Sequence, residues 1–259
     1  MTWTTRPRSK FDDLAAIDVG EGPLVVLLHG VGLRAEAWGG QIEPLVSAGY
    51  RVVCPDMLGH GETAFAAPSG LNSFAAPITA LLNEPAVLIG HSMGALIATQ
   101  IAASDNRNVK GVAALNAIYK RSFAARQAVL SRAHALDAQQ PNDASVTLRR
   151  WFEESASAER DACARWLQEV DPRAYKAAYT VFAESDGPTE AQLAAVTCPA
   201  MFVTGADEPN STPVMSLQMA SLAPKGRAEI IPGAAHMMPM THAAQINATL
   251  LPFVQECLT

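Results

Sequence analysis

The chain has 259 residues, 49% of them hydrophobic, and a formal net charge of -6. This length accommodates one α/β domain with a small insertion, and the apolar content is enough for a large core without disulfides or metal. The acidic balance argues against nucleic acid or an anionic membrane as a partner.

Short apolar runs alternate with helical stretches along most of the chain. The N-terminal stretch Phe11–Val19 predicts one or two antiparallel strands before a turn at Gly20–Pro23. Continuous Val, Ile and Leu runs then predict strands buried on both faces, at Leu24–Leu28, Arg51–Cys54, Ala86–Ile89, Val109–Leu115, Ala200–Thr204 and, more briefly, Ala228–Ile231. Helices are expected at Glu36–Ala48 and Met93–Ser104. The alternation predicts the α/β class, with a doubly wound, mostly parallel sheet.

The alternation stops between Tyr119 and Asp186, where no run is typical of a strand. This segment predicts only helices, at Phe123–Ala138, Ser145–Glu154, Glu159–Val170 and Arg173–Glu184. We therefore interpret residues 119–186 as a helical cap, inserted into a core domain made of residues 1–118 and 187–259.

The strongest chemical signal is the pentapeptide Gly90-His91-Ser92-Met93-Gly94. It follows a predicted buried strand and precedes a predicted helix, which is the setting of a nucleophile elbow. A sharp turn there needs small residues around the serine and places its hydroxyl above the sheet, at the positive end of a helix. Ser92 is therefore the candidate nucleophile, and a chance pentapeptide with a helix-capping serine is the weaker alternative.

A serine nucleophile needs a base and an acid, which in this strand order follow it along the chain. His236 comes directly after the last predicted strand and is the candidate base. Asp207 comes three residues after the preceding strand and is the candidate acid, with Glu208 as the structural alternative because neighbouring turn side chains point apart. The end of an earlier strand, a second place for an acid, carries Asn116, which cannot hold the required negative charge.

The oxyanion that forms during acyl transfer needs two backbone N–H donors. We expect one from Met93, directly after the nucleophile. The other is expected from Val31, in the glycine-rich turn His29-Gly30-Val31-Gly32 that follows the first buried strand. His29 itself is expected to brace this turn, and a turn without any catalytic role is the alternative.

The motifs HGVG, PDMLGHGET, GHSMGA, TGADEPNSTP and PGAAHMMP occur in this order, and the chain thereby resembles the α/β-hydrolase fold family. Within that family it is most similar to the 3-oxoadipate enol-lactonase and small carboxylesterase branch, which DPRAYKAAYTVFAESD in the cap resembles. Thr241 and the short segment between Gly61 and Pro85 depart from that branch. The resemblance implies a serine esterase or lactonase that acts through an acyl-enzyme on Ser92.

Two other functions remain open. Hydrolysis of a carbon–carbon bond in a ring-cleavage product occurs on the same fold, but such enzymes usually have Asn before the serine and an Asn-Trp pair after the oxyanion turn. This chain has His91 before the serine and Ala37 before Trp38. The second alternative is a ligand-binding member of the fold that does not turn over its ligand.

We further expect the substrate to carry a carboxylate that is bound by Arg34, four residues past Gly30, because a guanidinium can grip a carboxylate through two parallel hydrogen bonds. The alternative is that Arg34 pairs with Glu36 or Glu43. Further candidate substrate contacts come from the cap, namely the two tryptophans Trp151 and Trp166 and the arginines Arg149, Arg150 and Arg165.

No cofactor and no metal are expected. The chain has no phosphate-binding glycine loop, and its four cysteines share no metal-ligand spacing. Scattered cysteines suit a reduced cytoplasm, and we predict neither a signal peptide nor a transmembrane segment. The expected partner is a small-molecule substrate, and the sequence gives no indication of the oligomeric state.

Overall fold

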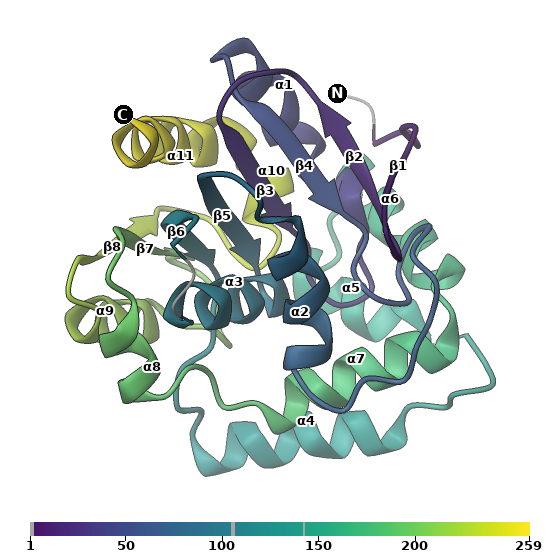
Figure 1. The fold of residues 1–259 in the computed structure, drawn as a ribbon. Coiled ribbons are helices and arrows are strands. Elements are labelled where there is room, and N and C mark those ends of the chain that lie inside the picture. Colours follow the sequence, from purple (N-terminus) through teal and green to yellow (C-terminus); the bar gives the residue numbers. More distant parts are fainter. Residues whose placement is uncertain (1–2, 105–106, 142) are drawn as a thin grey trace.

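A single twisted sheet organises residues 3–104, 107–141 and 143–259, which the computed structural model describes (Figure 1). Its eight described strands are β1 (Ser9–Phe11), β2 (Leu14–Val19), β3 (Leu24–Leu28), β4 (Arg51–Pro55), β5 (Ala86–His91), β6 (Val109–Leu115), β7 (Ala200–Gly205) and β8 (Gly226–Ile231). Their order is β1-β2-β4-β3-β5-β6-β7-β8. The pairs from β4 to β8 are parallel, whereas β1 and β2 run antiparallel. The predicted fold class is thereby confirmed.

The continuous apolar runs reflect burial on both faces of the sheet. All five residues of β3 are buried. Because side chains alternate along a strand, Val25 and Leu27 enter one hydrophobic core, whereas Val26 and Leu28 enter the other. A strand with two buried faces needs apolar residues at every position, so no alternation of apolar and polar residues is visible in the sequence.

Helices cover both faces of the sheet. One core holds Ile42 and Phe253, and the other holds Ile97 and Met219. The first face is covered by η1 (Ala35–Trp38), α1 (Gly39–Ser47), α10 (Met238–Thr241) and α11 (Ala243–Leu258). The second face is covered by α2 (Asn72–Leu81), α3 (Met93–Ala103), α8 (Glu190–Ala195) and α9 (Pro213–Leu222). Among the described residues, no helix combines the length and apolar character needed to cross a membrane.

Within the described part of the chain, four more helices follow β6 and precede α8, and we call them the cap helices (Figure 1). They are α4 (Phe123–Ala135), α5 (Ala144–Phe152), α6 (Ala158–Glu169) and α7 (Pro172–Glu184). Each begins after a Ser or Asp whose side chain accepts a hydrogen bond from a first-turn amide, which satisfies an otherwise unpaired donor. Helices were predicted throughout this segment, and the exact division into core and cap domains stays a prediction.

Candidate active site

Ser92 occupies a strained turn between β5 and α3. Its φ of 57° and ψ of -116° lie in a region that side chains with a Cβ rarely adopt. The two flanking glycines make the turn possible. A Cβ on Gly90 would lie 2.1 Å from the Gly94 carbonyl oxygen, and a Cβ on Gly94 would lie 2.1 Å from the Leu28 carbonyl oxygen. The strand–turn–helix setting predicted for the pentapeptide is therefore present.

Two backbone amides adjoin the serine. Met93 is the first residue of α3, so its N–H has no partner in the preceding turn of the helix. Val31 follows Gly30, at which an added Cβ would lie only 3.1 Å from Ser92 Cβ. Within the described residues, neither the Val31 nor the Met93 amide donates to an acceptor of the chain. Both donors are thus available to an oxyanion, as predicted, and that role stays a prediction.

Two buried histidines brace the turn that holds Val31. His60 Nε2 accepts a hydrogen bond from the Gly32 amide at 3.0 Å. His29 Nε2 accepts one from the Met57 amide at 2.9 Å, and its Nδ1 bonds to the Gly30 carbonyl oxygen. Burial lowers the pKa of both rings, to about 3 for His29. Both rings therefore stay neutral near pH 7 and can keep accepting from the amides. The bracing expected of His29 is confirmed.

The prediction that Asp207 is the partner of His236 is wrong. His236 Nδ1 lies 3.1 Å from Glu208 Oε2, whereas the Asp207 side chain faces solvent. The backbone explains the difference: the Asp207 amide bonds to the Ala234 carbonyl oxygen in the loop beyond β8, which turns its side chain outward. The next side chain, that of Glu208, then points inward and is buried.

The Glu208 carboxylate is held in its charged form. Its Oε1 accepts hydrogen bonds from the amides of Asn210 and Ser211, at 2.8 and 3.2 Å. Burial by itself raises the pKa of Glu208, but the His236 charge and these hydrogen bonds outweigh it and lower the pKa to about 2. A carboxylate that stays ionised can orient an imidazole and stabilise its protonated form.

His236 and Ser92 line the same cavity. Trp151 from α5 stacks on the His236 ring, with centroids 5.8 Å apart and an interplanar angle of 19°. Among the described residues no hydrogen bond joins Ser92 to the imidazole. In free enzymes this bond is often long and tightens when substrate binds.

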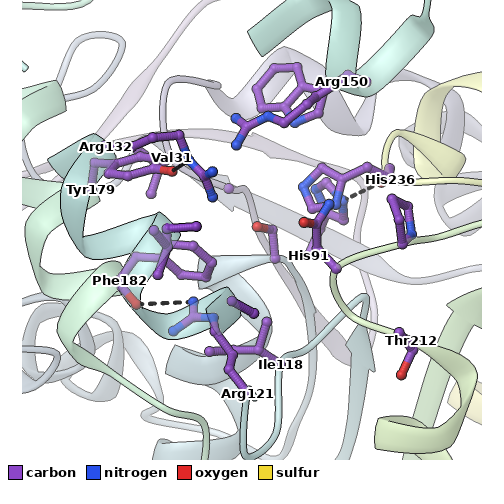
Figure 2. Close-up of a pocket in the computed structure, with 18 of the residues that line it drawn as sticks. Val31, His91, Ile118, Arg121, Arg132, Arg150, Tyr179, Phe182, Thr212 and His236 are labelled. Carbon is purple, nitrogen blue, oxygen red and sulfur yellow. Dashed lines mark hydrogen bonds between the residues drawn. The ribbon is translucent and has the colours of Figure 1, made fainter. Parts of the chain in front are cut away.

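The cavity has a volume of about 380 Å³ and lies between the sheet and the cap helices (Figure 2). Three arginines line it, Arg121 before α4, Arg132 on α4 and Arg150 on α5 (Figure 2). No Asp or Glu is among its described lining residues. The cavity is therefore cationic, in contrast to the chain as a whole, and it suits an anionic ligand.

The three arginines differ in how far the protein already uses them. Arg121 donates to carbonyl oxygens at the end of α7, including that of Phe182 at 3.3 Å, and its guanidinium lies 4.6 Å from the Phe182 ring centroid. Burial lowers the pKa of Arg121 to about 10, so it stays charged at pH 7. Among the described residues, Arg132 donates only its Nε, to the Tyr179 hydroxyl, and Arg150 Nε is buried without a partner. Arg132 and Arg150 thus keep donors for a ligand.

Two predicted substrate contacts lie elsewhere. Arg34 pairs with Glu36 at 2.9 Å and with Glu169 at 3.4 Å. Together with Trp166 it lines a separate cavity of about 250 Å³. The predictions that Arg34 and Trp166 contact substrate beside Ser92 are therefore wrong, and the alternative pairing of Arg34 with Glu36 is confirmed. Arg34 is drawn away because the buried Glu36 carboxylate is two residues along the same turn.

Of the other predicted cap contacts, Trp151 and Arg150 line the cavity, whereas Arg149 and Arg165 are exposed. The sequence reasoning missed Arg121 and Arg132. A signal for Arg132 exists, because Ala125, Val129 and Arg132 line the cavity at helical spacing.

Comparison with known proteins identifies the family of the chain. A model of the Alpha/beta hydrolase family matches residues 25–249. A curated protein of Acinetobacter baylyi, (E)-2-((N-methylformamido)methylene)succinate hydrolase, is 41% identical over 91% of this chain and 92% of its own. This chain belongs to the α/β hydrolase family and is an α/β hydrolase.

Solved structures support the same fold. A thermophilic esterase from Thermogutta terrifontis has a TM-score of 0.84 at 24% identity, covering 95% of this chain and 94% of its own. The enol-lactonase from Burkholderia xenovorans LB400 has a TM-score of 0.79 at 20% identity, covering 96% of this chain and 100% of its own. At these identities the likeness concerns the fold alone.

Proposed function

We propose that this chain is a serine hydrolase that cleaves an acyl bond in a small substrate bearing carboxylates. One observation carries the proposal. Ser92 and His236 line a cavity with three arginines and, among its described lining residues, no acidic side chain. A guanidinium binds a carboxylate through two parallel hydrogen bonds, and a shielded cavity strengthens that contact.

The proposed chemistry is acyl transfer. His236 removes the Ser92 proton while Oγ attacks the substrate carbonyl, and the amides of Val31 and Met93 receive the oxyanion. His236 then gives the proton to the leaving alcohol, enol or amine. Water, activated by His236, releases the acyl group from Ser92. Glu208 stays ionised throughout and stabilises the imidazolium.

The substrate class follows from the cavity and from the relative. Arg132 and Arg150 have free donors on two different cap helices, which suits two carboxylates better than one. The name of the Acinetobacter baylyi relative describes an N-formyl amide of a succinate, which has two carboxylates. We therefore propose an amidomethylene succinate as the first compound to test. Esters and lactones that carry a carboxylate are the second, because the same triad cleaves them.

The test compares Arg150→Ala with Arg149→Ala. Arg149 is a matched control because it is adjacent but exposed and paired with Glu154. Arg150→Ala is expected to lower kcat/KM for (E)-2-((N-methylformamido)methylene)succinate by about ten- to a hundredfold, about 1.4–2.8 kcal/mol. Arg149→Ala is expected to match the parent, and neither change is expected to affect a neutral nitrophenyl ester. Equal losses on both substrates would refute the carboxylate contact.

The products separate this proposal from its alternatives. Amide hydrolysis of the same compound releases formate, which proton NMR quantifies, and an ester or lactone substrate is recognised by its own acid product. A ring-cleavage product split at a carbon–carbon bond would instead indicate carbon–carbon hydrolysis. A hydrolase is expected to give a burst of nitrophenol from a nitrophenyl ester, and Ser92→Ala is expected to give none. If the parent also gives no burst, the result would favour a ligand-binding protein.

The remaining expectations stay predictions. Within the described residues no three His, Cys, Asp or Glu side chains gather as a metal site requires, and all four cysteines are free. A small-molecule partner, the lack of a cofactor and a cytoplasmic location are proposed on the grounds given by the sequence.

A further inference from the structure

The backbone carbonyl of His236 accepts two side-chain hydrogen bonds, and Figure 2 draws the one from His91. His91 Nε2 lies 2.7 Å from this oxygen, and Asn116 Nδ2 lies 2.8 Å from it. The donors come from the ends of two adjacent strands, β5 and β6, and reach a loop more than a hundred residues later in the chain. A carbonyl oxygen has two lone pairs, so its acceptor capacity is filled.

The backbone and the side chain of Asn116 are both fixed by their surroundings. It directly follows β6, is buried, and has a positive φ of 51°. Its Oδ1 accepts the Gly205 amide at 3.3 Å, at the end of β7, while Nδ2 also reaches the Ala235 carbonyl oxygen at 3.3 Å. The Oδ1 and Nδ2 atoms of Asn116 therefore connect the last residue of β7 to the loop that carries His236. The strained backbone of a buried residue is maintained where surrounding contacts fix it.

His91 has one tautomer that fits its position. Its Nε2 faces a carbonyl oxygen, so this nitrogen must carry the hydrogen. The ring is buried, with its centroid 5.0 Å from that of His236. Burial, followed by the nearby His236 charge, lowers the pKa of His91 to about 3. His91 thus stays neutral when His236 becomes protonated, and two adjacent cations are avoided.

We propose that His91 and Asn116 are positioning residues that hold His236 in place for Ser92 by sharing its backbone carbonyl oxygen. This inference rests on the proposed function of Ser92 and His236. The Glu208 contact sets the direction of the imidazole ring, but it does not hold the backbone of His236 itself. The clamp formed by His91 and Asn116 fixes that backbone, so proton transfer occurs without a costly rearrangement of the loop.

Three variants separate the donated hydrogen bond from the shape of the side chain. His91→Phe keeps a ring but loses the donor, His91→Gln keeps a donor amide, and Asn116→Ala removes the second donor. His91→Phe and Asn116→Ala are each expected to lower kcat about tenfold with KM within about twofold, because one net hydrogen bond is lost. His91→Gln is expected to recover most of the activity. The exposed His134→Phe is the control and is expected to match the parent.

The double variant His91→Phe with Asn116→Ala is the decisive measurement. Because both donors bind one oxygen, its loss in kcat is expected to exceed the product of the single losses and reach about a thousandfold. The rate at which a fluorophosphonate labels Ser92 is expected to fall in parallel, since this reaction needs His236 but no substrate contacts. Thermal unfolding of each variant checks the fold, and if the double variant does not fold, the labelling rates of the single variants decide.

Several results would overturn the clamp. Equal losses in His91→Gln and His91→Phe would assign the effect to shape, and a rise in KM at unchanged kcat would assign it to substrate binding. A folded double variant within about threefold of the parent kcat would also refute it. Ser92→Ala distinguishes this failure from that of the proposed function. If Ser92→Ala is inactive while the clamp variants have normal activity, only the positioning role of His91 and Asn116 is refuted. If Ser92→Ala stays active, the proposed function is refuted as well.

Discussion

Replacing Glu208 by Gln removes the negative charge beside His236 and retains the shape of the side chain. The Glu208 carboxylate is fully buried and lies 3.1 Å from His236 Nδ1. Two unit charges about 4 Å apart interact by about 4 kcal/mol at an effective dielectric constant of about 20. If the imidazolium of the transition state loses this stabilisation, kcat is expected to fall about a thousandfold. KM is expected to change little, because Glu208 does not line the cavity.

The adjacent Asp207→Asn is the matched control, because Asp207 is exposed and its substitution removes one negative charge, as Glu208→Gln does. Steady-state kinetics on one nitrophenyl ester, with thermal unfolding as a check on the fold, compares the two variants with the parent. Asp207→Asn is expected to stay within about twofold of the parent, since a surface charge contributes little. A large loss in Asp207→Asn together with a mild effect of Glu208→Gln would refute the assignment of the acid.

Two further predictions concern folding. Gly94→Ala is expected to abolish activity and to lower the yield of folded protein, because its Cβ would lie 2.1 Å from the Leu28 carbonyl oxygen; a folded, active Gly94→Ala protein would contradict this. His29 and His91 are buried and have a pKa of about 3, below the unfolded value of about 6.5. Below pH 6.5 the unfolded chain therefore binds more protons than the folded chain. The two histidines contribute their full share to the free energy of unfolding above that pH, and this share falls as the pH drops toward 3. Urea unfolding at pH 7 and pH 4.5 is expected to differ by on the order of 5 kcal/mol, and equal values would exclude buried neutral histidines.

The sheet and the elbow could be predicted because local chemistry dictates them. Strands β3 and β6 have the predicted bounds, Leu24–Leu28 and Val109–Leu115. Short continuous runs of Val, Leu and Ala suit strands in a sheet that is covered on both faces. The glycines around Ser92 are likewise required by the backbone itself, whatever the substrate. The predicted helix at Glu36–Ala48 instead begins as the 3-10 turn η1, and α2 was not predicted, since Pro77 interrupts its helical pattern.

The acid could not be assigned from the sequence, because the choice depends on one bond far along the chain. Asp207 and Glu208 are adjacent carboxylates, and turn geometry alone allows either to face His236. The bond from the Asp207 amide to the Ala234 carbonyl oxygen decides between them. Ala234 lies in the loop beyond β8, so its position relative to β7 exists only in the folded sheet.

The charge of the whole chain gives no indication of the charge in the cavity. A net charge of -6 is a property of the surface, and it argues against polyanionic partners that cover a large area. A small anion meets only the cavity, where Arg121, Arg132 and Arg150 have no acidic neighbour among the described lining residues. These arginines come from two cap helices, α4 and α5, and from the segment just before α4, and the fold brings their side chains to one cavity. A chain with a net negative charge can therefore still present a cationic cavity to a small anion.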